Sequence, residues 1–367
     1  MLPVTLLTGL DDGFRGAVAG NLLAEAGPRG VLVEYDVRDL SAVVRTARTA
    51  AGVIDREVIT MSHPCVSCAM RGSLVQLLAG IAAVERYDVA IVNVPAAGDT
   101  HAITTEVDQH PDLRVALVVT SVDTTTVLTD VQGEDLLRER GIPTAAEDGR
   151  ATAEVVVRQL EYADAAVLST TDNRTTDNRT ADDRTEGLLR AINPRLSTRT
   201  SPAGLLQVHP QLPRTIEPGS IAAPVDGLTF VWQAVRPFHP ERLYDALEDL
   251  VAGTVRGRGT LWIATQHRYR LSWDSFGTNV AFGVLGPWLV DLPADRWPAV
   301  GQQHQARSAL EWHPEYGDRA SYLSLTGPAL DVRELQERLD GCVLRADEAV
   351  HPLTDPFAPY LEGSTAA

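Results

Sequence analysis

The segment that decides the fold of the first half of the chain is residues 4–17, VTLLTGLDDGFRGA. Its first four residues form a short apolar run, which predicts a buried strand, and Thr8 and Gly9 end this run. Over residues 17–26, apolar side chains recur at helical spacing. The segment therefore predicts a strand, a glycine turn and a helix, the arrangement in which a helix N-terminus can bind phosphate groups.

Apolar runs farther along the chain have the length and composition of buried strands. They cover residues 31–35, 89–92, 115–119 and 165–168, with helical patterns between them, as at residues 74–84. Buried strands that alternate with helices predict a parallel sheet. The predicted fold class is α/β, with a mostly parallel sheet of the P-loop NTPase type and helices on both of its faces.

The second half of the chain has a different composition. A five-residue repeat, Thr-Asp-Asn-Arg-Thr, recurs over residues 171–185, and its polarity predicts a solvated loop. Residues 197–225 are rich in Pro, Ser and Gly and predict a linker. Short β-like segments and two helical patterns follow. We therefore predict one domain over residues 1–196 and a smaller α+β domain over residues 226–362.

Composition narrows the possible classes of function. The chain has 367 residues and a net charge of −17, which argues against a surface that binds nucleic acid through its phosphates. A protein partner with basic patches is compatible with this charge. Three cysteines cannot form a disulfide framework, and no apolar run has the length of a membrane span. The N-terminus lacks the features of a signal peptide, so we predict a cytoplasmic location without membrane contact.

Several phrases of the sequence resemble the CobW family. TGLDDGFRGA at residues 8–17 and QLEYAD at residues 159–164 resemble phrases of its first domain, and RPFHPERL at residues 236–243 resembles a phrase of its second. Proteins of this family pair a P-loop GTPase domain with a CobW C-terminal domain, and many are zinc or cobalt metallochaperones. The resemblance covers most of the chain and implies that residues 226–362 form a CobW C-terminal domain.

The segment that corresponds to the phosphate loop departs from the family pattern T-G-[FL]-L-G-A-G-K-[ST]. Gly9 and Gly13 remain, and Arg15 stands where the family has the lysine that contacts the β- and γ-phosphates. Asp11 and Asp12 place two carboxylates where phosphate oxygens would lie. One pair of like charges about 4 Å apart costs roughly 4 kcal/mol at an effective dielectric constant of about 20. The departures predict that phosphate and Mg²⁺ contacts are impaired.

The other two nucleotide motifs are changed as well. NVPA at residues 93–96 replaces the E-x-x-G that senses the γ-phosphate, and STTD at residues 169–172 replaces the guanine-reading N-K-x-D. Of the latter motif only Asp172 is retained. We therefore predict little or no GTP hydrolysis and doubt that GTP and Mg²⁺ are cofactors. The residues that would contact a bound nucleotide are Gly9, Gly13, Arg15 and Asp172.

The family binds its transported metal at G-C-x-C-C, and this motif is partly retained. Cys65 and Cys68 remain, and Ser67 replaces the middle cysteine. Zinc prefers four ligands, or three and a water molecule. His63 is near enough in sequence to be a third ligand, and His101 is a further histidine that could approach. The resemblance implies a weak or shared zinc site, and the alternative is a pair of reduced cysteines without a ligand.

Several residues of the second domain have structural interpretations. His239 precedes a proline and is expected to cap the helix that begins near residue 240. Asp318 and Arg319 are expected to pair across a turn, with Gly317 at positive φ. Four tryptophans are expected in the core, namely Trp262, Trp273, Trp288 and Trp312.

An actinobacterial branch of the family has degenerate nucleotide motifs and is associated with zinc starvation and ribosome hibernation. The resemblance to this branch implies an adaptor of the zinc-starvation response that recruits a hibernation factor to ribosomes. Its partner would be the ribosome or that factor, and not a specific nucleic-acid sequence. One alternative is a zinc metallochaperone GTPase with an atypical P-loop. Another is a structural remnant that only dimerises or packs within a complex.

Overall fold

The computed structural model describes residues 1–37, 41–61, 65–145, 147–169, 176–208, 214, 219–225, 227–348 and 352–361. The chain folds into two compact units, Met1–Thr215 and Ile216–Ala367. The domain limits given above, at residues 196 and 226, remain predictions.

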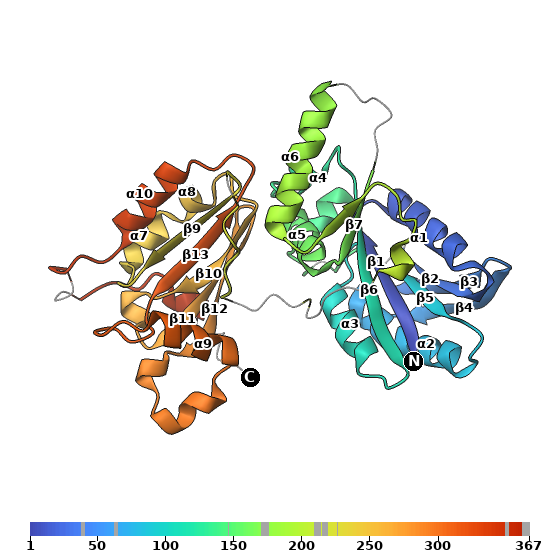
Figure 1. The fold of residues 1–367 in the computed structure, drawn as a ribbon, viewed down its shortest axis with the longest axis horizontal. Coiled ribbons are helices and arrows are strands. Elements are labelled where there is room, and N and C mark those ends of the chain that lie inside the picture. Colours follow the sequence, from blue (N-terminus) through green and yellow to red (C-terminus); the bar gives the residue numbers. More distant parts are fainter. Residues whose placement is uncertain are drawn as a thin grey trace. The chain divides into compact units, whose positions relative to one another are not determined.

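The N-terminal unit is built on an eight-stranded sheet with the order β4-β3-β2-β5-β1-β6-β7-β8 (Figure 1). Six neighbouring strands of this sheet are parallel, namely β2, β5, β1, β6, β7 and β8. β3 pairs in antiparallel fashion with both β2 and β4. The predicted α/β class with a mostly parallel sheet is thereby confirmed. The strands are β1 Leu2–Gly9, β2 Gly30–Asp36, β3 Ala42–Thr49, β4 Gly52–Thr60, β5 Val89–Asn93, β6 Leu113–Val122, β7 Ala165–Leu168 and β8 Ser197–Arg199.

Helices cover both faces of this sheet. Helix α1 packs on Leu7, Leu32 and Ile91 of three parallel strands. Helices α2, α3, α5 and α6 contact one another in succession on the opposite face, as right-handed crossovers require (Figure 1). The helices are α1 Asp12–Ala26, α2 Val66–Ala83, α3 Thr100–Asp108, α4 Val127–Asp130, α5 Thr152–Tyr162 and α6 Thr176–Ile192, with short 3₁₀ turns at Gly27–Arg29, Leu137–Arg140 and Leu205–Gln207.

Three parts of this unit differ from the prediction. Strand β8 lies within residues 197–225, which were predicted to be a linker, and it pairs in parallel with β7. Strands β3 and β4 form a hairpin that the apolar runs of the sequence did not predict. Residues 176–185, which were predicted to lie in a solvated loop, belong to α6. The polar composition of this segment was misleading. Leu188, Leu189 and Ile192 at the C-terminal end of α6 are buried, and their packing stabilises the polar helical turns before them.

Helix α2 is long and apolar enough to cross a membrane by length and composition. It has 18 residues and a mean hydropathy of 1.4, contrary to the expectation that no apolar run has this length. In the structure, however, Met70, Leu74 and Leu78 are fully buried within the unit. Arg71 on the same helix forms an ion pair with Glu106 of α3. These contacts are those of a helix that packs on the core of its own domain.

The C-terminal unit is built on a five-stranded antiparallel sheet with the order β12-β11-β10-β13-β9. One face of the sheet carries an apolar core, which includes Trp232, Trp273 and Leu325, under helices α7, α8 and α10. The elements are β9 Thr229–Ala234, α7 Pro240–Asp245, α8 Leu247–Val251, β10 Arg256–Leu261, β11 Tyr269–Phe276, β12 Asn279–Pro287, α9 Gln302–Glu311, β13 Ser321–Thr326, α10 Val332–Cys342 and α11 Ala358–Leu361, with 3₁₀ turns at Ala264–Gln266, Leu289–Asp291 and Ala294–Ala299. This arrangement confirms the predicted smaller α+β fold.

The local predictions for this unit had mixed outcomes. His239 caps α7 as expected, because its Nδ1 accepts a hydrogen bond from the backbone N–H of Arg242 at 3.5 Å. Gly317 has φ +67°, also as expected. Three of the tryptophans that were expected in the core are buried, namely Trp262, Trp273 and Trp288. Trp312, by contrast, is 41% exposed.

The predicted pairing of Asp318 with Arg319 is wrong. Asp318 accepts a hydrogen bond from Nε2 of His304 at 2.8 Å, while Arg319 forms an ion pair with Asp291. Neighbouring side chains leave the backbone in different directions, so each of the two finds its partner on its own side of the turn.

Candidate functional site

The turn after β1 is the centre of the nucleotide site that the sequence suggested. β1 ends at Gly9 and α1 begins at Asp12, so Leu10 and Asp11 alone lie between them. Gly9 has φ +146°, and a Cβ atom there would lie 2.1 Å from Oγ of Ser121 on β6. Gly9 is therefore required by the close approach of β1 to β6. A turn of this length leaves few backbone N–H groups outside the helix to surround a phosphate.

The carboxylate of Asp11 occupies the N-terminus of α1. Its Oδ1 accepts a hydrogen bond from the backbone N–H of Phe14 at 2.6 Å. Gly13 is the second residue of the helix, and a Cβ atom there would lie 3.4 Å from the same oxygen. Helix N-termini attract anions through their free N–H groups and the helix dipole. Here the anion is a side chain of the protein itself, and it would repel a phosphate at the same place.

Arg15 is buried, and its guanidinium group has three acceptors inside the unit. Nη1 donates to the carbonyl of Gly9 at 2.6 Å, Nε to Oδ1 of Asn93 at 2.7 Å, and Nη2 to Oδ1 of Asp12 at 2.5 Å. Burial lowers the pKa of Arg15, and the nearby carboxylate of Asp12 opposes this effect. The side chain that replaces the phosphate-binding lysine thus ties the ends of β1 and β5 to the start of α1.

The segment that was predicted to correspond to the guanine-reading motif is described only up to Ser169, and Asp172 lies outside the described residues. The hydroxyl of Ser169 donates to Oδ1 of Asp123 at 3.0 Å, and the same oxygen accepts from the backbone N–H of Thr125 at 2.9 Å. Burial alone would raise the pKa of Asp123, but these hydrogen bonds outweigh burial and lower it. Asp123 therefore joins the carboxyl ends of β6 and β7.

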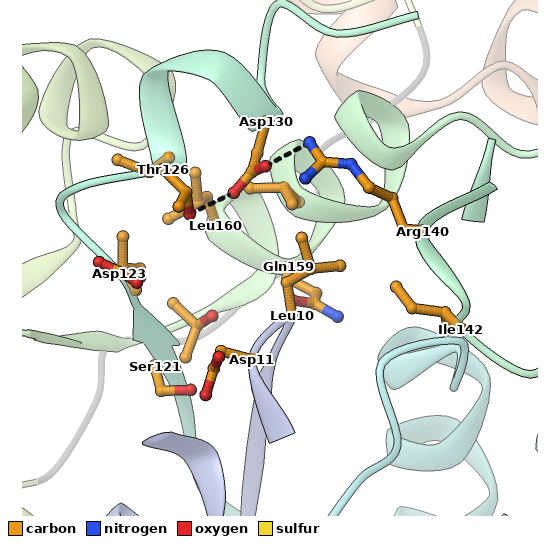
Figure 2. A pocket seen from close by; sticks show the side chains of 14 residues that line it. Leu10, Asp11, Ser121, Asp123, Thr126, Asp130, Arg140, Ile142, Gln159 and Leu160 are labelled. Carbon is orange, nitrogen blue, oxygen red and sulfur yellow. Dashed lines mark hydrogen bonds and ion pairs between the residues drawn. The ribbon is translucent and has the colours of Figure 1, made fainter. Parts of the chain in front are cut away.

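A cavity of about 230 Å³ lies at the carboxyl ends of β1 and β6, and Figure 2 shows the side chains that line it. Its charged groups are the carboxylates of Asp11, Asp123 and Asp130 and the guanidinium group of Arg140. Nη2 of Arg140 donates to Asp130 at 2.7 Å, and its Nε pairs with Asp135. The positive charge in the wall is thus matched by internal carboxylates, so the cavity favours neutral or cationic groups over phosphates.

Sequence reasoning did not find Asp130 and Arg140. The two lie 10 residues apart, on α4 and on a 3₁₀ turn, in a segment without a regular apolar pattern. A spacing of this kind gives no sign that the two side chains meet. The fold brings them together in the wall of the cavity.

A second ion pair holds the loop that stands in place of the γ-phosphate sensor. Asp148 forms an ion pair with Arg150, whose Nη2 donates to the carbonyl of Ala97 at 2.9 Å, just after β5. The hydrogen bonds from Arg150, together with one from Thr144, hold the pKa of Asp148 at about 2, below its usual value of 3.8. This carboxylate therefore stabilises the folded state while it is ionised.

We expect the Asp148 contribution to appear as a pH dependence. Because its folded pKa is depressed, its stabilisation is present above the unfolded pKa and is lost as pH falls through the interval from 3.8 to about 2. Wild type should lose about 1 kcal/mol more than Asp148→Asn between about pH 5 and about pH 3. Urea unfolding at both pH values measures this, with the exposed Asp112→Asn as control. An equal pH dependence in wild type and Asp148→Asn would contradict the assignment.

The two cysteines of the metal motif lie at the start of α2. Cys65 is the N-cap residue, and its Sγ accepts from the backbone N–H of Cys68 at 3.3 Å. The two Sγ atoms are 2.8 Å apart. The hydrogen bond between the thiols raises the pKa of Cys68, and burial adds to this. Ser67 accepts from the backbone N–H of Asp99 at 2.9 Å, which joins the motif to α3.

Within the part of the chain that the structure describes, no group of three or more His, Cys, Asp or Glu side chains could hold a metal ion. His63 lies outside the described residues. His101 packs edge-on against the ring of Tyr162, with the ring centres 5.5 Å apart. The structure therefore brings Cys65 and Cys68 together as predicted donors, and the identity of any further ligand remains a prediction.

The chain is similar to known families over most of its length. Residues 36–199 match the family described as the CobW/HypB/UreG nucleotide-binding domain. Residues 228–343 match the family described as the cobalamin synthesis protein cobW C-terminal domain.

Individual relatives are similar along nearly the whole chain. A Mycobacterium tuberculosis protein named as a zinc chaperone is 27% identical over 391 residues, which cover 98% of this chain and 93% of the relative. The zinc-regulated GTPase metalloprotein activator 1 of Dictyostelium discoideum is 24% identical over 393 residues, and the alignment covers 94% of this chain and 80% of the relative. Among solved structures, the Zn(II)-bound YjiA GTPase from E. coli is 15% identical with a TM-score of 0.38, with coverage of 94% of this chain and 99% of YjiA.

Proposed function

We propose that this chain, which belongs to the CobW family through a CobW/HypB/UreG nucleotide-binding domain and a CobW C-terminal domain, is an adaptor of the zinc-starvation response. In this proposal it acts in the cytoplasm, hydrolyses little or no GTP, and recruits a hibernation factor to ribosomes. The observation that carries the proposal is the carboxylate of Asp11 at the N-terminus of α1, where a P-loop protein places a phosphate.

The contacts around this carboxylate support the loss of GTP chemistry. A nucleotide does not fit the residues present, because its phosphate would meet Asp11 while Arg15 is already held by three internal acceptors. The residue after Arg15 is Gly16, which has no hydroxyl group for Mg²⁺. The family match begins at residue 36 and leaves out the whole turn after β1. We therefore route no catalytic step through GTP or Mg²⁺.

Zinc enters the proposal through the relatives and the cysteine pair. One relative is named a zinc chaperone and another a zinc-regulated GTPase metalloprotein activator. Two thiols at the start of one helix are suitable soft donors for zinc, and a tetrahedral site would need two further ligands. His63, water or a partner protein would supply them. We propose that zinc is bound weakly or shared and is a signal or a cargo.

The choice of a protein partner rests on charge and on the resemblance to the hibernation branch. A chain with a net charge of −17 repels exposed nucleic-acid phosphates, so its contact with a ribosome would be made through basic ribosomal proteins or through the hibernation factor.

Calorimetric titration with GTP and Mg²⁺ tests the first part of the proposal. We expect no saturable heat at a protein concentration of tens of micromolar, with or without zinc. Saturable binding would contradict our interpretation of Asp11 and Arg15. It would favour the alternative function, a zinc metallochaperone GTPase with an atypical P-loop. The names of the two relatives are in line with this alternative.

Zinc competition against a chromophoric chelator tests the cysteine pair. We expect Cys65→Ser and Cys68→Ser each to weaken zinc binding by more than about 100-fold, since even the loss of an outer-shell partner costs 10–100-fold. The matched control is Cys342→Ala, because Cys342 is buried and burial raises its thiol pKa to about 11. Equal zinc affinity in all variants would show that the pair is not a zinc site.

Co-sedimentation with purified ribosomes tests the partner. We expect the chain to pellet with ribosomes from zinc-limited cells when the hibernation factor is present, and not with ribosomes from zinc-replete cells. If the chain pellets with ribosomes from neither source, the ribosome part of the proposal is wrong, even if the titration shows no GTP binding.

A further inference from the structure

The C-terminal unit contains a second cavity, far in sequence from the nucleotide motifs. Its volume is about 380 Å³, which lies within the range of small-molecule sites. It opens on the sheet face opposite the apolar core, where Thr260 of β10, Arg270 of β11 and Tyr322 of β13 line it. Helix α9 and residues 219–221 form the other walls.

Arg270 is the unusual side chain in this cavity. Its Nη2 donates to the carbonyl of Leu285 at 3.2 Å. Its Nε is buried and has no hydrogen-bond partner, and no carboxylate of the described residues forms an ion pair with it. Burial lowers the pKa of Arg270, and the charge of Asp318 opposes this effect. A buried guanidinium group without a paired anion is costly, and such groups mark candidate binding sites.

The carboxylates of the wall have hydrogen-bond or ion-pair partners within the wall. Asp318 accepts from the backbone N–H groups of Leu289 and Val290 at 2.9 and 3.0 Å, and also from His304. Nε of Arg307 pairs with Oε2 of Glu311 at 3.5 Å, one turn along α9. Both carboxylates are therefore held by other groups. The charge of Asp318 acts on Arg270 from nearby, but neither carboxylate forms an ion pair with Arg270.

Further nitrogen atoms of the lining are unpaired. Trp288 is 1% exposed, and its indole Nε1 is buried without an acceptor in the described structure. Nδ1 of His304 is likewise buried and unpaired, while Nε2 of that ring is held by Asp318. The ring of Tyr322 lies under the guanidinium group of Arg307, 4.3 Å from its centre. The lining thus holds two unpaired donors, Nε of Arg270 and Nε1 of Trp288.

We propose that this cavity binds a small organic anion through a carboxylate or phosphate group. Arg270 carries the charge of the contact, and the indole N–H of Trp288 adds a hydrogen bond. A neutral ligand would leave the guanidinium group without its anion. The site is independent of the nucleotide and zinc motifs, so its test does not depend on the function proposed above.

Thermal unfolding of the full chain, followed by intrinsic tryptophan fluorescence, tests this site. All six tryptophans lie between residues 232 and 312, so the signal reports on the C-terminal unit. Phenyl phosphate and benzoate are the anionic probes, benzamide is the neutral control, and sodium chloride matches ionic strength. Ligand that binds the folded state raises Tm with its concentration. We expect a rise that depends on concentration with at least one anion and with neither control.

Variants locate the contact. Arg270→Met should weaken binding of the responsive anion by more than about 30-fold, as loss of a buried charge partner does. Trp288→Phe keeps the ring and should weaken it by about tenfold through the lost hydrogen bond. The matched control Arg333→Met removes an exposed guanidinium group on α10 and should bind like wild type.

Three results would overturn the proposal. These are the absence of a concentration-dependent Tm rise with both anions, an equal rise with benzamide, and affinity that survives in both Arg270→Met and Trp288→Phe. If Arg270→Met does not fold, calorimetry on Trp288→Phe decides the matter. A response to phenyl phosphate alone identifies the ligand as a phosphate, and a response to benzoate alone identifies it as a carboxylate.

Discussion

Arg15→Met should lower the free energy of unfolding of the N-terminal unit by about 3 kcal/mol, and it should bind GTP no more and no less than the wild type, for which we expect no binding. The variant removes three hydrogen bonds of a buried guanidinium group, to Gly9, Asn93 and Asp12. Ordinary hydrogen bonds contribute about 0.5–1.5 kcal/mol each, and those to charged groups about 1.5–3 kcal/mol. Urea unfolding followed by far-ultraviolet circular dichroism measures the loss.

The matched control is Arg29→Met, which removes an exposed guanidinium group from an ion pair with Asp88 in the same unit. Exposed pairs contribute little, so the control should unfold almost like wild type. The two interpretations of Arg15 make opposite predictions. A residue that binds phosphate would lose GTP affinity on substitution and keep its stability, and that result would contradict the structural role.

Gly259→Ala should destabilise the C-terminal unit by about 3 kcal/mol or more. Gly259 lies on β10 between two neighbouring strands, and a Cβ atom there would be 1.9 Å from the carbonyl oxygen of Tyr322 and 2.9 Å from Cα of Leu323. Both atoms belong to the backbone, so no change of side-chain rotamer can relieve these clashes. Insertion of one methyl group into a tight core already costs about 1–3 kcal/mol, and here the strands themselves must separate.

Gly341→Ala in α10 is the control for this variant. No heavy atom lies within 4 Å of the Cβ that it would gain, so the change should raise stability by roughly 0.5–1 kcal/mol through helix propensity. Urea unfolding followed by tryptophan fluorescence reports on this unit for both variants. If Gly259→Ala unfolds at the wild-type urea concentration, the close approach of β10 to β13 is not present in solution.

The sequence predicted most of the parallel part of the fold because β1, β2, β5, β6 and β7 are apolar runs between helices. It did not predict β8, a polar strand of three residues inside the predicted linker. It did not predict β3 and β4, since β4 is mostly exposed and its apolar residues include Val53 and Val58 on the surface. The N-terminal turns of α6 were missed for a related reason. A polar repeat has no periodicity of its own, and its helix depends on buried residues farther along the chain.

The candidate sites were predictable to different degrees. The replacement of lysine by Arg15 was visible in the sequence, and so was the cysteine pair. The acceptors of Arg15 were not, because Asn93 is 78 residues away and meets it only through the parallel sheet. The cavity around Arg270 could not be predicted from the sequence either. Its lining residues come from separate strands and from α9, and no motif connects them.

The contacts of Arg15 also bear on whether a lysine could take its place in the turn after β1. A lysine has a single nitrogen, so it could not serve Gly9, Asn93 and Asp12 at the widely separated positions that the guanidinium group reaches. Arg15→Lys alone would therefore weaken the fold, and Asp11 would still cap the helix. Under the function proposed above, several simultaneous substitutions would be needed before this turn could hold a phosphate, so the buried guanidinium group limits which single substitutions the turn tolerates.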